Sequence, residues 1–225
     1  MSAGSEVPVA GLGCICGAGP NLAASMETLF KGIGRPRLPT AFAVQPPAPP
    51  VFEVDPHFFD PGAFEKAVTA RVPQLALTAA TEALNDAGLG GEELQGARVG
   101  VCLGTNVACS FNDVSDDPPC DDDAELVFSG AGRFLRNNPS VALVKALRLT
   151  GPTQTVVNAC SAGTDAIGIG AGWIAAGRCD VVICGGVDAL YLVSYLGFKS
   201  LMISDNRPCR PFDRHRAGLN LGEGA

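Results

Sequence analysis

The sequence is poor in the residues that build metal sites, disulfide frameworks and nucleic-acid surfaces. It has only two histidines, His57 and His215, and no pair of cysteines spaced Cys-x-x-Cys, so a zinc or other metal site is not expected. The sequence has 16 Lys and Arg and 23 Asp and Glu, and its basic residues form no dense stripe. This composition argues against a nucleic-acid partner. The nine cysteines are an odd number with no export signal before them. A reduced, cytoplasmic protein is therefore the better interpretation.

Long apolar runs are also missing. No uncharged apolar stretch reaches the ~20 residues of a transmembrane helix, and "MSAGSEVPVAGLG" lacks the basic start and continuous apolar run of a secretory signal. We therefore expect no membrane contact. Hydrophobic residues nevertheless make up 47% of the chain and charged residues only 17%, which favours a deeply buried α/β core.

Strand patterns alternate with helix patterns along the chain. "VPVAGLGCICGAG" (7–19) is typical of a buried strand before a glycine turn, and "ARVGVCLGT" (97–105) is apolar on both sides, as in a central strand. Between them, "PQLALTAATEALNDAGL" predicts a helix that stops at Gly88. A helix, a Gly-Pro turn and a strand follow up to Cys160, and "CDVVICGG" is the last strand. This order predicts an α/β fold with a largely parallel sheet.

Cys160 differs from the other cysteines by its position between a predicted strand and a predicted helix, in "TVVNACSAGTDAI". The free N–H groups and positive dipole end of a helix N-terminus favour an anion, and a thiolate is the reactive form of cysteine. The same N–H groups can hold an oxyanion, so acyl transfer through a thioester is the natural chemistry. A small buried hydrophobic residue is the competing interpretation. Which way Asp165, in the first turn of this helix, faces stays open.

The helix after Cys160 consists almost entirely of glycine and alanine. Each of its glycines costs about 1 kcal/mol relative to alanine in a helix interior. Such a composition indicates that other backbone comes very close, and we expect the helix to be buried between two layers. The glycines are Gly163, Gly168, Gly170, Gly172 and Gly177.

These segments resemble the β-ketoacyl synthases of the thiolase-like superfamily, of the elongating type that uses acyl carrier protein. The matches run in order and include "VAGLGCICGAG", "LALTAATEALNDAGL", "RVGVCLGT", "GPTQTVVNACSAGTDAI", "AGRCDVVICGGVDAL" and "RPCRPFDRHRAGLNLGEGA". The last match discriminates best, because thiolases and initiating ketoacyl synthases share the fold and the nucleophilic cysteine but usually lack an RPFD…GEGA segment.

The resemblance implies a layered αβαβα core of two related halves. The chain, 1–225, would supply the N-terminal half, with insertions at about 35–65 and 105–150. Cys160 would accept an acyl group from a carrier protein, and its own N–H would form half of the oxyanion hole. The reaction implied is decarboxylative condensation with malonyl-acyl carrier protein in fatty acid or polyketide/polyene synthesis, without a cofactor. Dimerisation, homomeric or heteromeric, would use the strand near 153–158.

The resemblance also suggests residues for binding. Segments near 128–138 would approach the partner subunit's acyl pocket, and the candidate substrate-binding residues are Phe128, Phe134 and Phe198. Carrier proteins of this pathway are acidic, so docking should use local basic residues. The candidates for docking are Lys66, Arg71, Arg133 and Arg136.

Three positions depart from the family pattern. Ala217 and Leu219 stand where the family usually has Asp and Phe, and Asp188 stands where it usually has Glu. These differences bear on the acyl substrate more than on the fold.

The family places two catalytic histidines and a lysine in a second half, and members are about twice as long as this chain. Neither His57 nor His215 is a convincing replacement, so the chain alone should be incomplete for condensation and should need a complementary C-terminal half. Two other functions stay open: a non-catalytic subunit resembling a chain-length factor, and a cysteine-dependent thioester hydrolase using Cys160 and His215.

Overall fold

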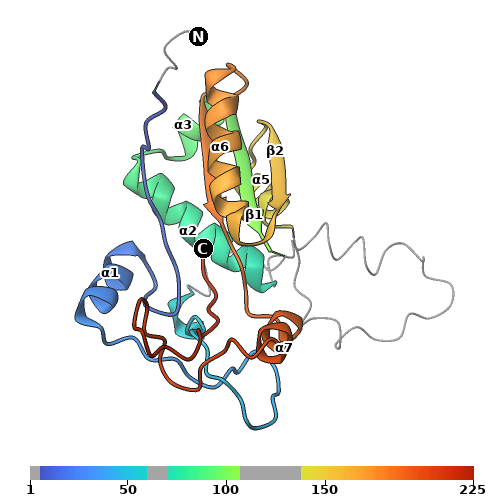
Figure 1. Cartoon of the computed structure of the whole chain (residues 1–225). Helices are drawn as coiled ribbons and strands as arrows, with labels where there is room; N and C mark the ends of the chain where they lie inside the picture. The colour runs from blue at the N-terminus through green and yellow to red at the C-terminus, as the bar shows by residue number, and fades with distance from the viewer. Residues whose placement is uncertain (1–5, 60–69, 107–137) are drawn as a thin grey trace, which may run out of the picture.

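A parallel sheet lies at the centre of the chain (Figure 1). The structure, a computed structural model, describes residues 6–59, 70–106 and 138–225. Among these residues, three strands pair in the order β2-β1-β3, namely β1 (Val99–Thr105), β2 (Thr153–Val157) and β3 (Val181–Gly186). The strands predicted over 97–105, before Cys160 and in "CDVVICGG" are confirmed, whereas the strand predicted over 7–19 is not. β1 is buried along its whole length, as the apolar pattern predicted for a central strand.

Helices pack on both faces of this sheet. α2 contacts α5, and α5 packs on β1 and β2, whereas α6 covers the opposite face. The result is an α/β/α arrangement of three layers, which confirms the predicted fold class (Figure 1). The helices are α1 (Leu22–Lys31), α2 (Arg71–Asp86), α3 (Gly91–Gly96), α5 (Pro139–Leu147), α6 (Ala162–Ala175) and α7 (Leu192–Ser200), with short 3-10 turns η1 (Pro56–Phe58) and η3 (Ala159–Ser161).

Alternate side chains of β1 supply two hydrophobic cores, one on each face of the sheet, because successive side chains of a strand point to opposite faces. Val101 joins Leu75 and Leu143 in the core beneath α2 and α5. Cys102 joins Ala166 and Trp173 in the core beneath α6. The core beneath α6 therefore fixes this helix in the position from which it carries the residues that follow Cys160.

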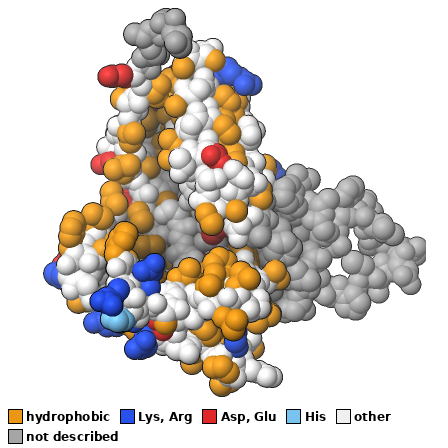
Figure 2. Space-filling model, viewed as in Figure 1, with side chains coloured by type: hydrophobic (Ala, Val, Ile, Leu, Met, Phe, Trp, Pro, Cys, Tyr) orange, Lys and Arg blue, Asp and Glu red, His pale blue; other side chains and the backbone are white. Residues whose placement is uncertain are grey.

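α6 is covered on one side only within the described part of the chain. Ala162, Ala166 and Trp173 face the sheet and are buried, whereas Ile167 on the opposite side is 51% exposed. The expectation of a helix buried between two layers is therefore wrong for this chain by itself. In Figure 2 hydrophobic side chains lie open on the face that α6 shares with α1 and the N-terminal segment.

The N-terminal segment is not the buried strand predicted over 7–19. It runs across α2 (Figure 1), and Val9 is 77% exposed. A Cβ on Gly13 would lie 1.9 Å from the Ala79 carbonyl oxygen, so the segment is pressed onto the helix backbone. Its N–H groups find partners on α2, since the Cys14 N–H donates to Glu82 at 2.8 Å. These tertiary contacts replace strand pairing.

The region predicted as an insertion at 35–65 lies on the body of the protein as far as residue 59. Val51 and Val54 are almost fully buried, and Phe42 packs against Tyr195 with ring centroids 5.3 Å apart. The second predicted insertion, 105–150, falls largely outside the described residues. Its last part forms α5, which belongs to the core layer.

Two residues just before the strands, Arg98 and Asp180, connect β1 to β3 at the amino end of the sheet. The Arg98 guanidinium donates to the Asp180 carboxylate at 2.6 and 3.1 Å, and its backbone N–H donates at 2.9 Å. The side-chain hydrogen bond from Arg98 lowers the pKa of Asp180 to about 2. Because this folded-state pKa lies below the unfolded value, the pair stabilises the fold above about pH 4, and this contribution is lost as the pH falls through about 2.

We therefore expect Asp180→Asn to lower the melting temperature at neutral pH, with a difference from the native chain that shrinks between about pH 4 and pH 2. Circular dichroism melts across this range measure the difference. Glu27→Gln, which removes an exposed carboxylate paired with Lys31, controls for the loss of one negative charge. A difference that does not change with pH would contradict the assignment.

In the described part of the chain, no helix is both long and apolar enough to span a bilayer.

Candidate active site

The carboxyl ends of the parallel strands meet at one edge of the sheet, where α/β proteins commonly bind ligands. A cavity of about 410 Å³ opens there. β1 contributes Gly104 and Thr105, and the turn after β2 contributes Cys160. Asp188 follows β3, and Cys16 comes from the N-terminal segment. Segments far apart in the sequence therefore build a single pocket that Cys160 lines.

Cys160 is exposed and lines this cavity. It lies in η3, directly before α6, so the predicted order of strand, tight turn and helix is confirmed. Ala159 adopts φ 48°, a left-handed conformation that side chains other than glycine rarely adopt. Such strain is commonly held where a functional side chain must be presented in a fixed direction. The competing interpretation, a small buried hydrophobic residue, does not fit an exposed thiol.

Asp165 is turned toward the residues on either side of Cys160. Its carboxylate accepts a hydrogen bond from Asn158 Nδ2 at 2.6 Å and lies 3.0 Å from Ser161 Oγ. Asn158 Nδ2 also donates to Ser161 Oγ at 2.9 Å. The negative charge lies in the first turn of α6, where the helix dipole stabilises it. The network holds the turn, and Asn158 and Ser161 were not among the predicted site residues.

Close backbone contact places the start of α6 against the strand ends. A Cβ on Gly104 would lie 2.1 Å from the carbonyl carbon and oxygen of Ala162. A Cβ on Gly163 would lie 3.3 Å from the Gly186 Cα. The absence of side chains at these positions lets the helix N-terminus, with its unpaired N–H groups, sit directly above the sheet edge.

Asp188 is a half-buried carboxyl group in the cavity wall. It accepts hydrogen bonds from the Thr105 hydroxyl and the Asn106 N–H, both at 2.9 Å. Burial raises its pKa, while these two hydrogen bonds act in the opposite direction. The Asp188 backbone also pairs with Gly224 in both directions, at 3.0 and 2.9 Å. Asp188, which lies in the segment after β3, thus connects the end of β1 to Gly224 near the end of the chain.

Most of the other predicted site residues cannot be compared with the Cys160 cavity. Lys66, Phe128, Phe134, Arg133 and Arg136 lie outside the described residues. Phe198 is half-buried in α7 and does not line the cavity.

Arg71 has a structural partner instead of a free side chain. Its guanidinium binds the Glu223 carboxylate, which is 1% exposed, and lies 4.7 Å from the centre of the Phe59 ring. We therefore leave Arg71 out of the candidate docking surface.

Both histidines lie away from the cavity. His57 is exposed in η1, and His215 is exposed in a loop where its N–H donates to Asp213 at 2.6 Å. Neither lines the cavity, so the structure offers no support for a Cys160–His215 pair. Within the described ranges, no three His, Cys, Asp or Glu side chains group closely enough to hold a metal ion.

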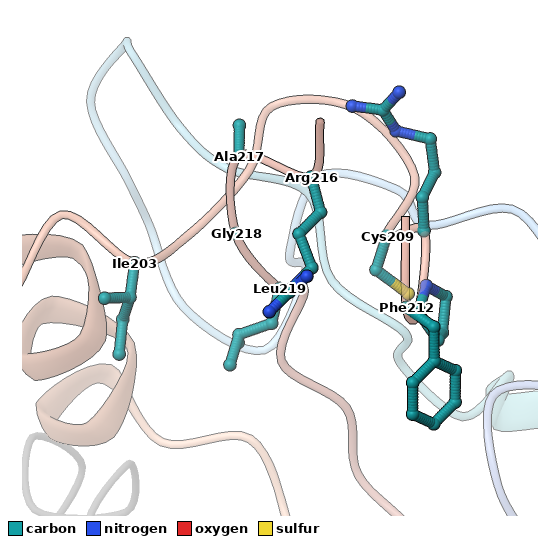
Figure 3. Close-up of a pocket in the computed structure, with 9 residues that line it drawn as sticks. Ile203, Cys209, Phe212, Arg216, Ala217, Gly218 and Leu219 are labelled. Atoms are coloured by element: carbon teal, nitrogen blue, oxygen red, sulfur yellow. The ribbon is translucent and has the colours of Figure 1, made fainter. Parts of the chain in front are cut away.

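A larger cavity, of about 790 Å³, lies within the loop after α7 (Figure 3). The cavity is lined by Ala217 and Leu219, together with Arg210 and Arg216. Ala217 and Leu219 are two of the positions that depart from the family pattern. None of its lining residues is shared with the Cys160 cavity.

Comparison with known families decides what kind of protein has this site. The family described as "Beta-ketoacyl synthase, N-terminal domain" matches residues 5–225. The chain belongs to the β-ketoacyl synthase family. This membership confirms the resemblance seen in the sequence.

Several relatives of this ketosynthase chain have known names. The ketoacyl synthase alpha subunit of the tetracenomycin polyketide synthase of Streptomyces glaucescens is 30% identical, over 98% of this chain and 56% of that protein. The 3-oxoacyl-[acyl-carrier-protein] synthase 2 of Synechocystis is 31% identical, over 69% of this chain and 39% of that protein. The chain thus spans about half the length, or less, of these relatives.

A solved structure described as the ishigamide ketosynthase/chain length factor has the same fold. It superimposes with a TM-score of 0.78 and 27% sequence identity, over 96% of this chain and 56% of that one. The thiolase-like ketosynthase architecture of this chain is therefore shown.

Proposed function

We propose that this chain carries the acyl-accepting step of a β-ketoacyl synthase, with Cys160 as the nucleophile. The observation that carries the proposal is the exposed Cys160 thiol, which lines a cavity directly before the N-terminus of α6. The named relatives act in polyketide synthesis and as 3-oxoacyl-[acyl-carrier-protein] synthases, which supports a carrier-bound acyl thioester as the substrate class.

The proposed step is a thioester exchange. The Cys160 thiolate attacks the carbonyl carbon of the acyl thioester, and N–H groups at the start of α6, including that of Cys160 itself, stabilise the oxyanion. The bond to the carrier sulfur then breaks, and the carrier thiolate leaves. The product is an acyl group held on Cys160 inside the cavity.

The condensation that follows requires further groups. Decarboxylation of a malonyl thioester leaves an enolate, which needs hydrogen-bond donors to stabilise it. His57 and His215 lie elsewhere, so we propose that a complementary C-terminal half supplies these donors. Its proposed position is over the outer side of α6, where Ile167 is exposed and a Cβ on Gly168 or Gly172 would meet nothing within 4 Å.

A second subunit is proposed to pair along β2. This strand is at the edge of the described sheet, and Val157 is 54% exposed. An unpaired edge strand presents free N–H and C=O groups to another chain. The structural relative described as a ketosynthase/chain length factor supports a homomeric or heteromeric arrangement of this kind. Carrier-protein docking on Lys66, Arg133 and Arg136 remains a proposal from the sequence.

Acylation of Cys160 is tested by incubating the full chain with an acyl carrier protein thioester or a small acyl thioester. We expect one acyl group on the tryptic peptide 149–178, whose only cysteine is Cys160. Cys160→Ala should reduce the amount of acyl group on this peptide at least about 100-fold, because the nucleophile is lost. Peptide mass spectrometry measures it.

Two further variants separate the alternatives. Cys209→Ala, at the larger cavity, is the matched control and should leave the label unchanged. His215→Ala should also leave the acyl label on Cys160 unchanged. This result would exclude a thioester hydrolase that uses Cys160 and His215. Absence of any acyl group on Cys160 in the native chain would overturn the proposal and favour the non-catalytic subunit.

A further inference from the structure

A second cysteine, Cys16, lines the same cavity as Cys160. It is half-buried and lies in a tight loop in which Cys16 and Gly19 exchange backbone hydrogen bonds at 3.1 and 3.0 Å. The Ile15 N–H bonds to the Ala225 carbonyl at 3.0 Å, so this loop is joined to the segment that also borders the cavity. The position of Cys16 is therefore fixed by backbone contacts on two sides.

The sulfur of Cys16 lies among hydrogen-bond donors. Ser25 Oγ is 3.5 Å away, and Ser25 is 2% exposed. When Cys16 carries its proton, the thiol can donate to Ser25, and Ser25 donates to the Gly19 carbonyl at 3.3 Å. When Cys16 is ionised, the Ser25 hydroxyl can turn its proton toward the sulfur. The cluster thus provides partners for both protonation states.

The pKa values of Cys14 and Cys16 are shifted in opposite directions. The side-chain hydrogen bond from Cys14 lowers the pKa of Cys16 to about 5. Burial acts in the opposite direction. Hydrogen bonds from Ser25 and from the Ala18 and Gly19 N–H groups lower the pKa further. The same Cys14–Cys16 hydrogen bond, together with burial, raises the pKa of Cys14. Cys14 does not line the cavity, whereas Cys16 does. The thiol whose pKa is lowered is therefore the one that lines the cavity.

We propose that Cys16 is a second nucleophilic thiol of the cavity and accepts acyl groups from thioesters alongside Cys160. The inference extends the proposed function, because it uses the same thioester substrate. A thiolate is the reactive form of cysteine, and its hydrogen-bonded surroundings determine which cysteine of a protein reacts.

The chemistry needs no additional reagent. The Cys16 thiolate attacks the carbonyl carbon of the thioester and forms a new carbon–sulfur bond. The carbon–sulfur bond to the original thiol breaks, and the departing thiolate takes up a proton from water. One thioester replaces another, so nothing is oxidised or reduced.

The test is acylation of the full chain with a small acyl thioester, followed by fragment-ion mapping of the peptide 1–31, which contains both Cys14 and Cys16. In the Cys160→Ala variant we expect one acyl group on Cys16 and none on Cys14. The double variant Cys160→Ala/Cys16→Ser should carry less than about a tenth of this label, because no other cysteine of the described residues lines the cavity.

The pH profile distinguishes a reactive thiolate from a cysteine that is merely accessible. The initial rate at Cys16 should change less than about threefold between pH 8 and pH 6, because the thiol is already ionised there. Ser25→Ala or Cys14→Ala should reduce the rate at pH 6 at least about tenfold relative to that at pH 8, since each removes a donor to the sulfur. Iodoacetamide labelling of the native chain gives an independent measurement that needs no variant.

The outcomes separate this inference from the proposed function. Acyl groups on Cys160 only, with none on Cys16 in either chain, overturn the inference and leave the proposed function standing. Equal labelling of Cys14 and Cys16, or a rate at Cys16 that falls about tenfold per pH unit below pH 8, also overturns it. A label on Cys16 with none on Cys160 overturns the proposed function instead.

Discussion

Gly104→Ala is expected to destabilise the chain by about 3 kcal/mol and to reduce acylation of Cys160 at least about tenfold. The new Cβ would lie 2.1 Å from the carbonyl carbon and oxygen of Ala162, and 2.4 Å from the Gly163 nitrogen. All three are backbone atoms of the first turn of α6, so no rotation of a side chain relieves the overlap. The start of α6, and with it the Cys160 turn, would have to move away from the sheet.

Gly172→Ala is the matched control, because it makes the same change on the outer side of α6. Nothing lies within 4 Å of a Cβ at this position. In the chain by itself we expect a gain of about 1 kcal/mol from helix propensity. Urea unfolding and peptide mapping measure both variants. Equal stabilities for the two variants would show that the contact between Gly104 and α6 does not constrain the helix.

The central sheet and the Cys160 turn could be predicted because their signals are local. β1 is an uninterrupted apolar run flanked by helix patterns, and the residues around Cys160 change from strand to helix within a few positions. The residues of each segment indicate its type of secondary structure, although β1 pairs with strands that are distant in sequence. That is why the strands, α2 and the place of the nucleophile agree with the expectations.

The N-terminal segment could not be predicted in the same way. Residues 7–19 have the composition of a strand, but Gly11 and Gly13 meet the backbone of α2, and the Leu12 N–H donates to Asp86 at 2.9 Å. These contacts join residues more than 60 positions apart, and periodicity carries no information about them. The Cys16 cluster depends on the turn into α1, which brings Ser25, nine positions later in the sequence, to the sulfur.

The network of Asn158, Ser161 and Asp165 was missed for a different reason. All three residues are close in sequence, but the sequence leaves open whether the first-turn carboxylate faces the thiol or the preceding turn. The structure shows that it binds Asn158 and Ser161. The direction of the Asp165 side chain, rather than the secondary structure of this segment, was the feature that could not be predicted. Hydroxyl and amide groups that flank a nucleophile, with a carboxylate four residues after the hydroxyl, are the signal that could have suggested it.

Glu223→Ala is expected to cost about 3–5 kcal/mol, because it removes one partner of a buried ion pair. The Glu223 carboxylate accepts hydrogen bonds from the Val54 N–H at 2.9 Å and the Leu190 N–H at 3.2 Å, and it also binds the Arg71 guanidinium. These contacts hold together the start of α2, the loop before η1, the segment after β3 and the end of the chain. Alanine would remove the carboxylate that the Arg71 guanidinium and these two N–H groups bind.

Comparison with an exposed pair separates burial from charge. Glu27→Gln removes a carboxylate that is 64% exposed and binds Lys31 one helical turn away. Exposed pairs of this kind contribute about 0–1 kcal/mol, so this variant should unfold at nearly the same urea concentration as the native chain. Glu223→Gln should stay close to Glu223→Ala, because an amide nitrogen would point a donor at a group that already donates.

The double variant Arg71→Met/Glu223→Leu tests why the single change is costly. If the cost arises from a guanidinium left buried without a counter-charge, then removing both charges should recover at least about half of the stability lost in Glu223→Ala. The Val54 and Leu190 N–H groups would still lose their hydrogen bonds to the Glu223 carboxylate, which is why recovery should be incomplete. A double variant no more stable than Glu223→Ala would place the whole cost on those backbone hydrogen bonds. In that case the contacts of Arg71 with the Val54 carbonyl and the Phe59 ring would still keep it out of the carrier-docking surface.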